Sequence, residues 1–224
     1  MAGPVLFDFG GTLDADGRPW GERLFEGYQS AGGHVARDPF LACFRVSDRL
    51  LAATPEIVGL GLRAMVERQV ALLRGLLPDG GGIGAAAWVD RFLAAAHATA
   101  ERNHPMLIAL ARTRPLGVVS NFTGNLRPCL EELGLLECFE LVLDSAVVGL
   151  RKPDERLFAA AFSALDVEPE ACWMVGDNPF ADIAPAAKLG CSTCWIAPAE
   201  RPLPAGARPD RRIAALTELP AVLG

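Results

Sequence analysis

Short apolar runs alternate with helical patterns along most of this chain, and this alternation constrains its fold more than any other feature. Runs typical of buried strands occur at Val5–Phe9, Gly117–Ser120, Leu141–Leu143, Trp173–Val175 and Thr193–Ile196. Helical apolar spacing occurs between them at Leu126–Leu133, Glu155–Leu165 and Ala181–Leu189. Strands that alternate with helices favour a parallel sheet. The sequence therefore predicts an α/β fold with a Rossmann-like parallel sheet core covered by helices.

One long interval breaks the alternation, because no strand pattern occurs between Leu13 and about Arg114. Amphipathic helical patterns fill it instead, at Glu22–Ser30, Pro39–Ala52, Leu62–Leu77 and Ala86–Arg102. We therefore expect an α/β core formed by residues 1–14 and 110–224 and an all-helical cap domain formed by residues 15–109. A cap inserted after the first strand would lie over the carboxyl ends of the strands, where open α/β sheets bind ligands.

Composition narrows the classes of partner. The 224 residues are 51% hydrophobic and carry a formal net charge of −6, which is not the composition of a disordered chain. Because there is no basic run, neither nucleic acid nor an anionic membrane surface is an expected partner. No apolar stretch approaches the ~18 residues of a membrane span, and the first residues lack the basic segment of a signal peptide. We expect a soluble, cytoplasmic protein.

The six cysteines are scattered along the chain, and without a signal peptide their even number is poor support for disulfides. Cys191 and Cys194 have the CxxC spacing of redox and metal-binding pairs. Alternation of side chains along a buried strand explains the same spacing. The sequence leaves the role of these two cysteines open.

The first predicted strand ends at a carboxylate. Asp8 follows its apolar residues and stands directly before Phe9, Gly10 and Gly11. An acid at the carboxyl edge of a buried strand is costly to place without a partner. Asp8 either caps the backbone amides of a turn or acts as a nucleophile that other groups approach closely at the glycines. This segment alone does not separate the two interpretations.

Other polar residues lie at or after the ends of later predicted elements. They are Ser120, Asn121, Lys152, Asp177 and Asp182. The carboxyl ends of parallel strands meet at one edge of the sheet. We therefore expect these side chains to converge on the same crevice as Asp8.

Taken in order, Asp8-Phe9-Gly10-Gly11-Thr12, Ser120, Lys152-Pro153 and Gly176-Asp177-x4-Asp182 resemble the four motifs of the haloacid dehalogenase-like (HAD) superfamily. Members of that superfamily are mostly phosphatases. The resemblance covers nearly the whole chain, and the predicted insert matches the helical cap of that superfamily. It implies a hydrolase that removes the phosphoryl group of a small phosphorylated metabolite through an aspartyl-phosphate.

The resemblance also implies roles for the matching residues. Asp8 would be the nucleophile, and Ser120 would donate a hydrogen bond to a phosphoryl oxygen. Lys152 would steady Asp8 and the transferring group as a compact cation. The residues implied to orient or bind the substrate are Gly11, Thr12 and Asn121.

Mg²⁺ is the cofactor that the resemblance implies. A carboxylate that attacks an anionic phosphate needs the charge neutralised, which a metal ion achieves. The implied ligands are Asp8, the backbone carbonyl of Gly10 and Asp177, with Asp182 at the metal or next to it.

The first motif departs from the family pattern. HAD phosphatases have Asp-x-Asp-x-Thr, and Gly10 replaces the second Asp, which protonates the leaving group and then activates water. Loss of a positioned acid/base costs roughly 10²–10⁴-fold in rate, or about 3–5 kcal/mol of barrier. Asp14 and Asp16 are candidate substitutes, although acids there are also typical of a polar turn. We expect slow or atypical turnover that is best on activated phosphates.

Two branches of the superfamily also lack the second Asp of the first motif. Phosphonate-cleaving members use a cap lysine, and no lysine precedes Lys152 in this chain, which argues strongly against that branch. The 2-haloacid dehalogenases need no metal and attract a carboxylate substrate with cap arginines, for which the candidates are Arg23, Arg45, Arg49, Arg63 and Arg68. Against this branch, Asp177 and Asp182 without a metal would repel such a substrate. A catalytically impaired pseudo-phosphatase with a binding or regulatory role is the other alternative.

The substrate itself is not identified by the sequence. In this architecture the cap selects it, and the cap has only generic helical patterning. Trp20 and Trp88 either line a pocket or pack in the core. His34, His97 and His104 lie in the cap interval without metal-ligand spacing.

Overall fold

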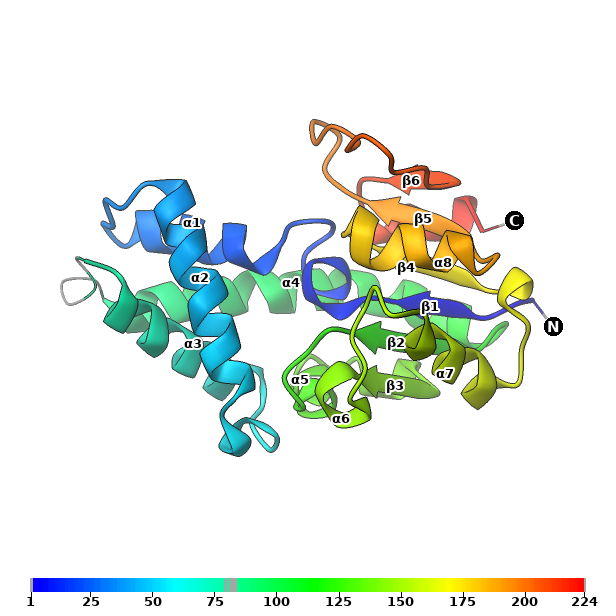
Figure 1. Ribbon diagram of the computed structural model, residues 1–224, viewed down its shortest axis with the longest axis horizontal. Coiled ribbons are helices and arrows are strands. Elements are labelled where there is room, and N and C mark those ends of the chain that lie inside the picture. The colour runs from blue at the N-terminus through cyan, green and yellow to red at the C-terminus, as the bar shows by residue number, and fades with distance from the viewer. Residues whose placement is uncertain (1, 79, 81–83, 224) are drawn as a thin grey trace.

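The computed structural model of the protein describes residues 2–78, 80 and 84–223 and consists of an α/β core and a helical cap (Figure 1). The strands are β1 (Val5–Phe7), β2 (Leu116–Ser120), β3 (Leu141–Asp144), β4 (Trp173–Gly176), β5 (Ser192–Ile196) and β6 (Arg211–Ile213). The helices are α1 (Trp20–Ser30), α2 (Arg37–Ala52), α3 (Leu62–Leu76), α4 (Ala85–Ala111), α5 (Leu126–Glu132), α6 (Ser145–Val148), α7 (Glu155–Leu165) and α8 (Ala184–Lys188). The predicted α/β fold is confirmed.

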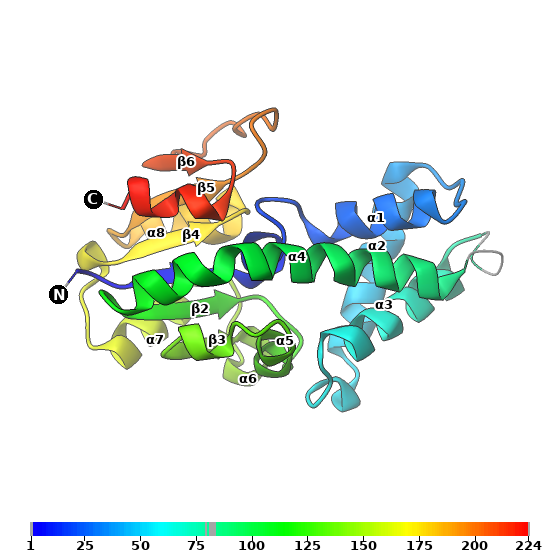
Figure 2. The same ribbon diagram turned by 180° about the vertical axis from the view of Figure 1, so that it is seen from behind.

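The strands form one parallel sheet in the order β3-β2-β1-β4-β5-β6. Side chains alternate across a strand, so on β1 Val5 and Phe7 pack into one apolar cluster and Leu6 packs into the other. Helices α7 and α8 cover one face of the sheet (Figure 1). Helix α4 and the carboxyl-terminal residues cover the opposite face (Figure 2). A central strand buried in this way explains the uninterrupted apolar run before Asp8.

The cap consists of α1, α2, α3 and the first part of α4 (Figures 1 and 2). The sequence predicts a helix that ends at Arg102, but α4 continues to Ala111 and reaches the core. Leu107 and Leu110 of this extension are buried in the core cluster, which stabilises the extra turns. Pro105 lies inside the helix. Because α4 belongs to both lobes, the predicted domain boundary at residues 109 and 110 stays a prediction.

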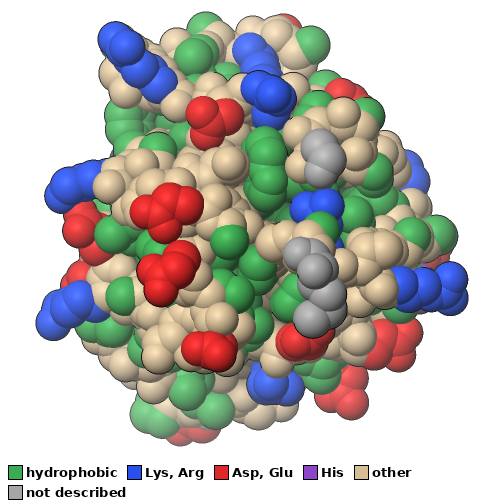
Figure 3. Space-filling view, turned by 90° about the vertical axis from the view of Figure 1, so that its right-hand side faces the viewer, with side chains coloured by type: hydrophobic (Ala, Val, Ile, Leu, Met, Phe, Trp, Pro, Cys, Tyr) green, Lys and Arg blue, Asp and Glu red, His purple; other side chains and the backbone are tan. Residues whose placement is uncertain are grey.

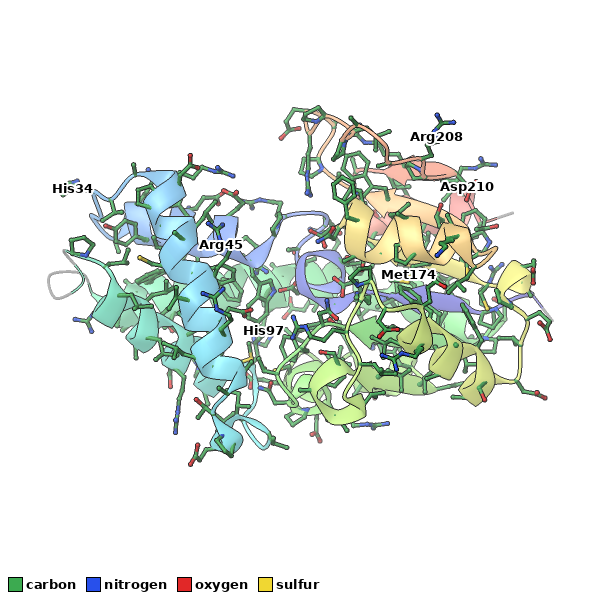
Figure 4. All side chains as sticks on the ribbon, viewed as in Figure 1. His34, Arg45, His97, Met174, Arg208 and Asp210 are labelled. Atoms are coloured by element: carbon green, nitrogen blue, oxygen red, sulfur yellow. The ribbon has the colours of Figure 1, made fainter. Side chains whose placement is uncertain are left out.

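The edge strand β6 was not expected from the sequence. Arg211 and Arg212 are exposed and only Ile213 is buried, so the strand has no recognisable apolar pattern. The preceding Asp210, labelled in Figure 4, accepts hydrogen bonds from the backbone amide and the hydroxyl of Thr193 on β5, at 2.8 and 2.9 Å. These bonds bring the segment to the edge of the sheet.

Two surface properties bear on partners. Within the described ranges, no helix combines the length and the apolar character needed to cross a membrane. Figure 3 shows the end of the core remote from the cap, where basic side chains are separated from one another and interspersed with acidic ones.

Candidate active site

The predicted site residues meet at the carboxyl end of the sheet, beneath the cap. Asp8 follows β1, Ser120 ends β2 and Asp177 follows β4. They line a cavity of about 230 Å³, and Phe44 of α2 and Met65 of α3 line its cap side. The cap therefore lies over the strand ends, as predicted from the position of the insert.

Asp8 is held by a cation and a hydroxyl. The Nζ atom of Lys152 donates to Asp8 Oδ1 at 2.6 Å and to the backbone carbonyl of Val119 at 2.8 Å. The hydroxyl of Ser120 donates to the same Asp8 oxygen at 2.9 Å. All three polar side chains are buried, so these contacts fix Asp8 in one orientation.

Asn121 holds the segment that carries Lys152. Its amide nitrogen donates to the backbone carbonyl of Lys152 at 2.9 Å, and its amide oxygen accepts from the Lys152 backbone amide at 2.7 Å. Both ends of the Asn121 amide are thus used within the protein. This contact explains how a lysine 144 positions away in the sequence reaches Asp8.

Three buried carboxylates form a cluster. Asp8, Asp177 and Asp182 each offer an oxygen, and these oxygens lie within 4.8 Å of one another. Burial raises the pKa of Asp177 well above its ordinary value, and repulsion from Asp8 and Asp182 raises it further. Burial also raises the pKa of Asp182 to about 6, against the opposing attraction of Lys152. The cluster therefore carries more negative charge than its surroundings neutralise.

The nearby cations do not balance the cluster. Lys152 Nζ lies 2.6 Å from Asp182 Oδ1 as well as from Asp8. Burial alone would lower the pKa of Lys152, but the two carboxylates outweigh burial and raise it. Arg201 lies farther away, with 3.8 Å between its Nη1 atom and Asp177 Oδ2. Two cations face three carboxylates, which leaves a net negative charge.

A divalent metal ion fits this arrangement. The donor set consists of carboxylate oxygens, which Mg²⁺ prefers. Asp182 Oδ1 is buried, and its close polar contact among the described residues is the ion pair with Lys152. A side chain at Gly11 would lie 2.8 Å from Asp177 Oδ2, and Gly11 has a φ of +92°, so only glycine leaves this oxygen free.

The indole of Trp20 occupies the space next to Gly10. A Cβ atom at position 10 would lie 3.2 Å from Trp20 Nε1 and 3.4 Å from Trp20 Cδ1. The indole packs edge-on against Phe9, Phe92 and Phe122, with ring centroids 4.9–6.2 Å apart. A cap residue therefore fills the volume in which the missing second acid of the motif would stand.

Asp14 does not substitute for that acid. Its carboxylate is fully buried and accepts from the Gly11 amide at 2.7 Å, from Trp20 Nε1 at 2.7 Å and from Arg23 Nη1 at 2.5 Å. Asp16 forms an ion pair with Arg102 instead. Both acids of the turn are thus engaged in structural contacts, and Asp14 ties the loop after β1 to helix α1.

Thr12 lies in the same loop. Its hydroxyl is fully buried and has no hydrogen-bond partner among the described residues. It does not line the cavity, whereas Asp8, Gly10, Ser120 and Asn121 do. The structure thus brings most predicted site residues together, whereas neither Gly11 nor Thr12 lines the cavity.

Other candidates lie away from the cavity. None of the described residues that line it is one of the five cap arginines, which include Arg45 on α2 (Figure 4), nor is any of them a histidine. His34 lies at the end of the cap farthest from the sheet (Figure 4). Cys191 and Cys194 are free and buried, and burial raises the pKa of each thiol to about 12. Because the thiolate is the form that reacts and binds metals, thiols with such a high pKa are poorly suited to redox chemistry or metal binding.

Two charged residues of the cavity were not singled out from the sequence. Asp48 lies on α2, and Arg151 precedes Lys152. Partial removal of water raises the pKa of Asp48, although the side chain remains exposed, and the charge of Arg151 opposes this rise. The four-residue spacing of Phe44, Asp48 and Ala52 places them on one face of a helix. The sequence does not show that this face lines the cavity.

Comparison with known proteins gives the family. The chain matches the haloacid dehalogenase-like hydrolases over residues 5–190. It is 33% identical over 210 residues to the phosphoserine phosphatase of Thermus thermophilus, which covers 90% of this chain and 76% of the relative. It is 31% identical over 120 residues to the pyrimidine 5'-nucleotidase YjjG of Escherichia coli, about half the length of each protein.

Solved structures show the same fold. A 2-haloacid dehalogenase from Pseudomonas syringae is 26% identical and superposes with a TM-score of 0.55 over 100% of this chain and 98% of that chain. The putative hydrolase YfnB from Bacillus subtilis, solved with magnesium, is 23% identical, with a TM-score of 0.61 over 100% of this chain and 99% of that chain. With its motifs, its sheet and the match over most of its length, the chain belongs to the haloacid dehalogenase-like hydrolase family.

Proposed function

We propose that this hydrolase is a Mg²⁺-dependent phosphatase that acts on a small phosphorylated metabolite through an aspartyl-phosphate on Asp8. The observation that carries the proposal is the buried cluster of Asp8, Asp177 and Asp182 beside Lys152. Paired acids with an excess of negative charge suit a metal ion and phosphoryl transfer. The two relatives named above are, by name, enzymes of phosphorylated compounds, which supports this substrate class.

The reaction would use the residues in the positions described. An oxygen of Asp8 attacks phosphorus and the bond to the leaving alcohol breaks; the alcohol takes its proton from water. A second water then attacks the acyl phosphate, which releases phosphate and restores the carboxylate. Lys152 and Ser120 hold Asp8 and contact the phosphoryl oxygens, while the Gly11 amide, bound to Asp14, fixes the loop that follows Asp8.

Mg²⁺, held by Asp8, Asp177, Asp182 and the carbonyl of Gly10, would neutralise charge on the transferring phosphoryl group. Because position 10 is a glycine, no carboxylic acid stands there to protonate the leaving group. We therefore expect slow turnover on alkyl phosphates and faster turnover on acyl or aryl phosphates.

A second candidate is a protein that binds a phosphorylated ligand without turning it over. The observation that favours it is the position of Trp20, whose indole closes the space beside Gly10. Turnover separates the two candidates.

The test is hydrolysis of a panel of alkyl, aryl and acyl phosphates with Mg²⁺ and with EDTA. We expect Mg²⁺-dependent release of phosphate that Asp8→Asn abolishes. Asp38→Asn removes an exposed carboxylate of α2 outside the cavity and serves as the matched control. Hydrolysis that persists in Asp8→Asn would contradict the proposed nucleophile, and no hydrolysis by the wild type would favour the binding protein.

A further inference from the structure

The cavity has two charged groups that the phosphoryl site does not use. Its acidic and basic lining residues are Asp8, Asp48, Arg151, Lys152, Asp177 and Asp182. Asp8, Asp177 and Asp182 form the carboxylate cluster described above, and Lys152 is paired with it. The remaining two, Asp48 from the cap and Arg151 from the core, carry opposite charges and face the same free space.

The other polar side chains that line the cavity already have partners. Ser120 donates to Asp8, and Asn121 binds the backbone of Lys152. Thr123 donates to Asn125 at 2.6 Å. The amide oxygen of Asn178 accepts from two backbone amides of the next turn. Most of the hydrogen-bonding capacity of these groups is thus used within the protein.

Asp48 and Arg151 differ from them. Both side chains are exposed, and among the described residues neither has a hydrogen bond or an ion pair within 4 Å. Arg49 is a second charged neighbour of Asp48, and Asp144 is a second charged neighbour of Arg151. Asp48 and Arg151 are close enough for the charge of Arg151 to oppose the rise in the pKa of Asp48. Two opposite charges that line the same cavity and are open to solvent form a complementary surface for a ligand with one charge of each sign.

The rest of the wall supports a small ligand. Trp20, Phe44 and Met65 make the cap side apolar, and the cavity encloses about 230 Å³. A guanidinium presents a fork that matches a carboxylate, and a carboxylate accepts hydrogen bonds from an ammonium group. The apolar wall offers no further polar contact to a larger sugar or base.

We propose that the substrate is a small zwitterionic phosphomonoester, whose carboxylate binds Arg151 and whose ammonium group binds Asp48 while its phosphate lies at Asp8. This rests on the proposed phosphatase function and deepens it by naming the substrate class. Arg151 and Asp48 are then specificity-determining residues and take no part in the chemical step.

The test compares four small phosphate esters that differ in which of the two charged groups they carry. O-phosphoserine carries both groups, phosphoethanolamine only the ammonium, 2-phosphoglycolate only the carboxylate, and glycerol 1-phosphate neither. We expect the highest kcat/KM for O-phosphoserine. Asp48→Asn should lower kcat/KM roughly 10-fold or more for the two ammonium compounds alone, and Arg151→Gln should do the same for the two carboxylate compounds alone.

The controls are Asp38→Asn and Arg45→Gln, which change the same kinds of charge on α2 outside the cavity. Equal losses on all four esters would overturn the proposal, because a cap-closing contact between Asp48 and Arg151 or an acid role for Asp48 predicts that result. Calorimetric binding of the same esters in Mg²⁺ makes the comparison without turnover. Hydrolysis without charge preference refutes only the substrate class, whereas selective binding of O-phosphoserine without hydrolysis refutes only the phosphatase.

Discussion

Restoring the missing acid with Gly10→Asp tests whether the rate of hydrolysis is limited by the absence of this acid and by the packing of Trp20 beside it. Gly10 has φ −73° and ψ 114°, which any residue adopts, so Gly10→Asp meets no backbone strain. Its Cβ atom, however, would lie 3.2 Å from Trp20 Nε1. The indole cannot withdraw easily, because it packs among phenylalanines and donates to Asp14 at 2.7 Å. We expect Gly10→Asp to cost about 1–3 kcal/mol of stability through overpacking.

The same contact limits the gain in activity. In Gly10→Asp alone the indole would displace the new carboxylate, and we expect less than about a tenth of the ~10²-fold gain that a positioned acid provides. Trp20→Phe removes the atom nearest to position 10 and keeps an aromatic ring. The double variant Gly10→Asp/Trp20→Phe should therefore approach the full ~10²-fold, or about 3 kcal/mol of barrier.

The assay is steady-state hydrolysis of O-phosphoserine and of p-nitrophenyl phosphate, with urea denaturation of each variant. The gain should appear in kcat for the alkyl ester and be small for the nitrophenyl ester, because nitrophenolate leaves without a proton. Trp20→Phe alone is the control and should show no gain. The reasoning is refuted if Gly10→Asp alone gives the full gain without loss of stability, or if the double variant gains equally on both esters.

Two further outcomes follow from buried charges. Asp14→Ala would leave the buried Arg23 without its partner, and we expect a loss of about 3–5 kcal/mol in the free energy of unfolding by urea. The control Asp38→Ala removes an exposed pair with Arg37 and should cost under about 1 kcal/mol. Equal losses in the two variants would contradict this expectation. Asp182 has a pKa of about 6 in the folded protein and ~3.9 in the unfolded chain, so the folded state holds the proton more tightly. Its stabilising contribution is complete below about pH 4 and falls by roughly 3 kcal/mol as pH rises through 6. The Tm of the metal-free wild type relative to Asp182→Asn should thus fall between pH 4 and 6.5, less so with Mg²⁺, and a relative Tm that rises contradicts the sign.

Local patterns were sufficient for most of the fold. The predicted helix Glu155–Leu165 has the bounds of α7, because Asp154 caps it by accepting a hydrogen bond from the Arg156 amide. The five predicted strands have short apolar runs, which are largely buried in β1, β2, β4 and β5 and half-buried in β3. The edge strand β6 has one buried residue, Ile213, and its position depends on Asp210 and β5, which are distant in the sequence pattern.

The site divides in the same way. Asp8, Ser120 and Asp177 stand at strand ends, and parallel topology alone brings such positions together, whereas Lys152 lies in the loop between α6 and α7 and is held there by Asn121. Trp20 packs beside Gly10, and Asp48 and Arg151 line one cavity from the cap and from the core. These placements depend on how two lobes dock, which neither helical periodicity nor motif spacing encodes.

The course of α4 has a mechanical consequence for the cap. Of the two covalent joints between the lobes, one is this continuous helix and the other is the segment that Asp14 anchors to α1. A movement of the cap relative to the core must therefore bend helix α4. The helix bends most easily one turn before Pro105, because proline has no backbone amide to donate to the carbonyl of Glu101. We therefore expect the stiffness of this one helical turn to limit how far the cap can open over the cavity.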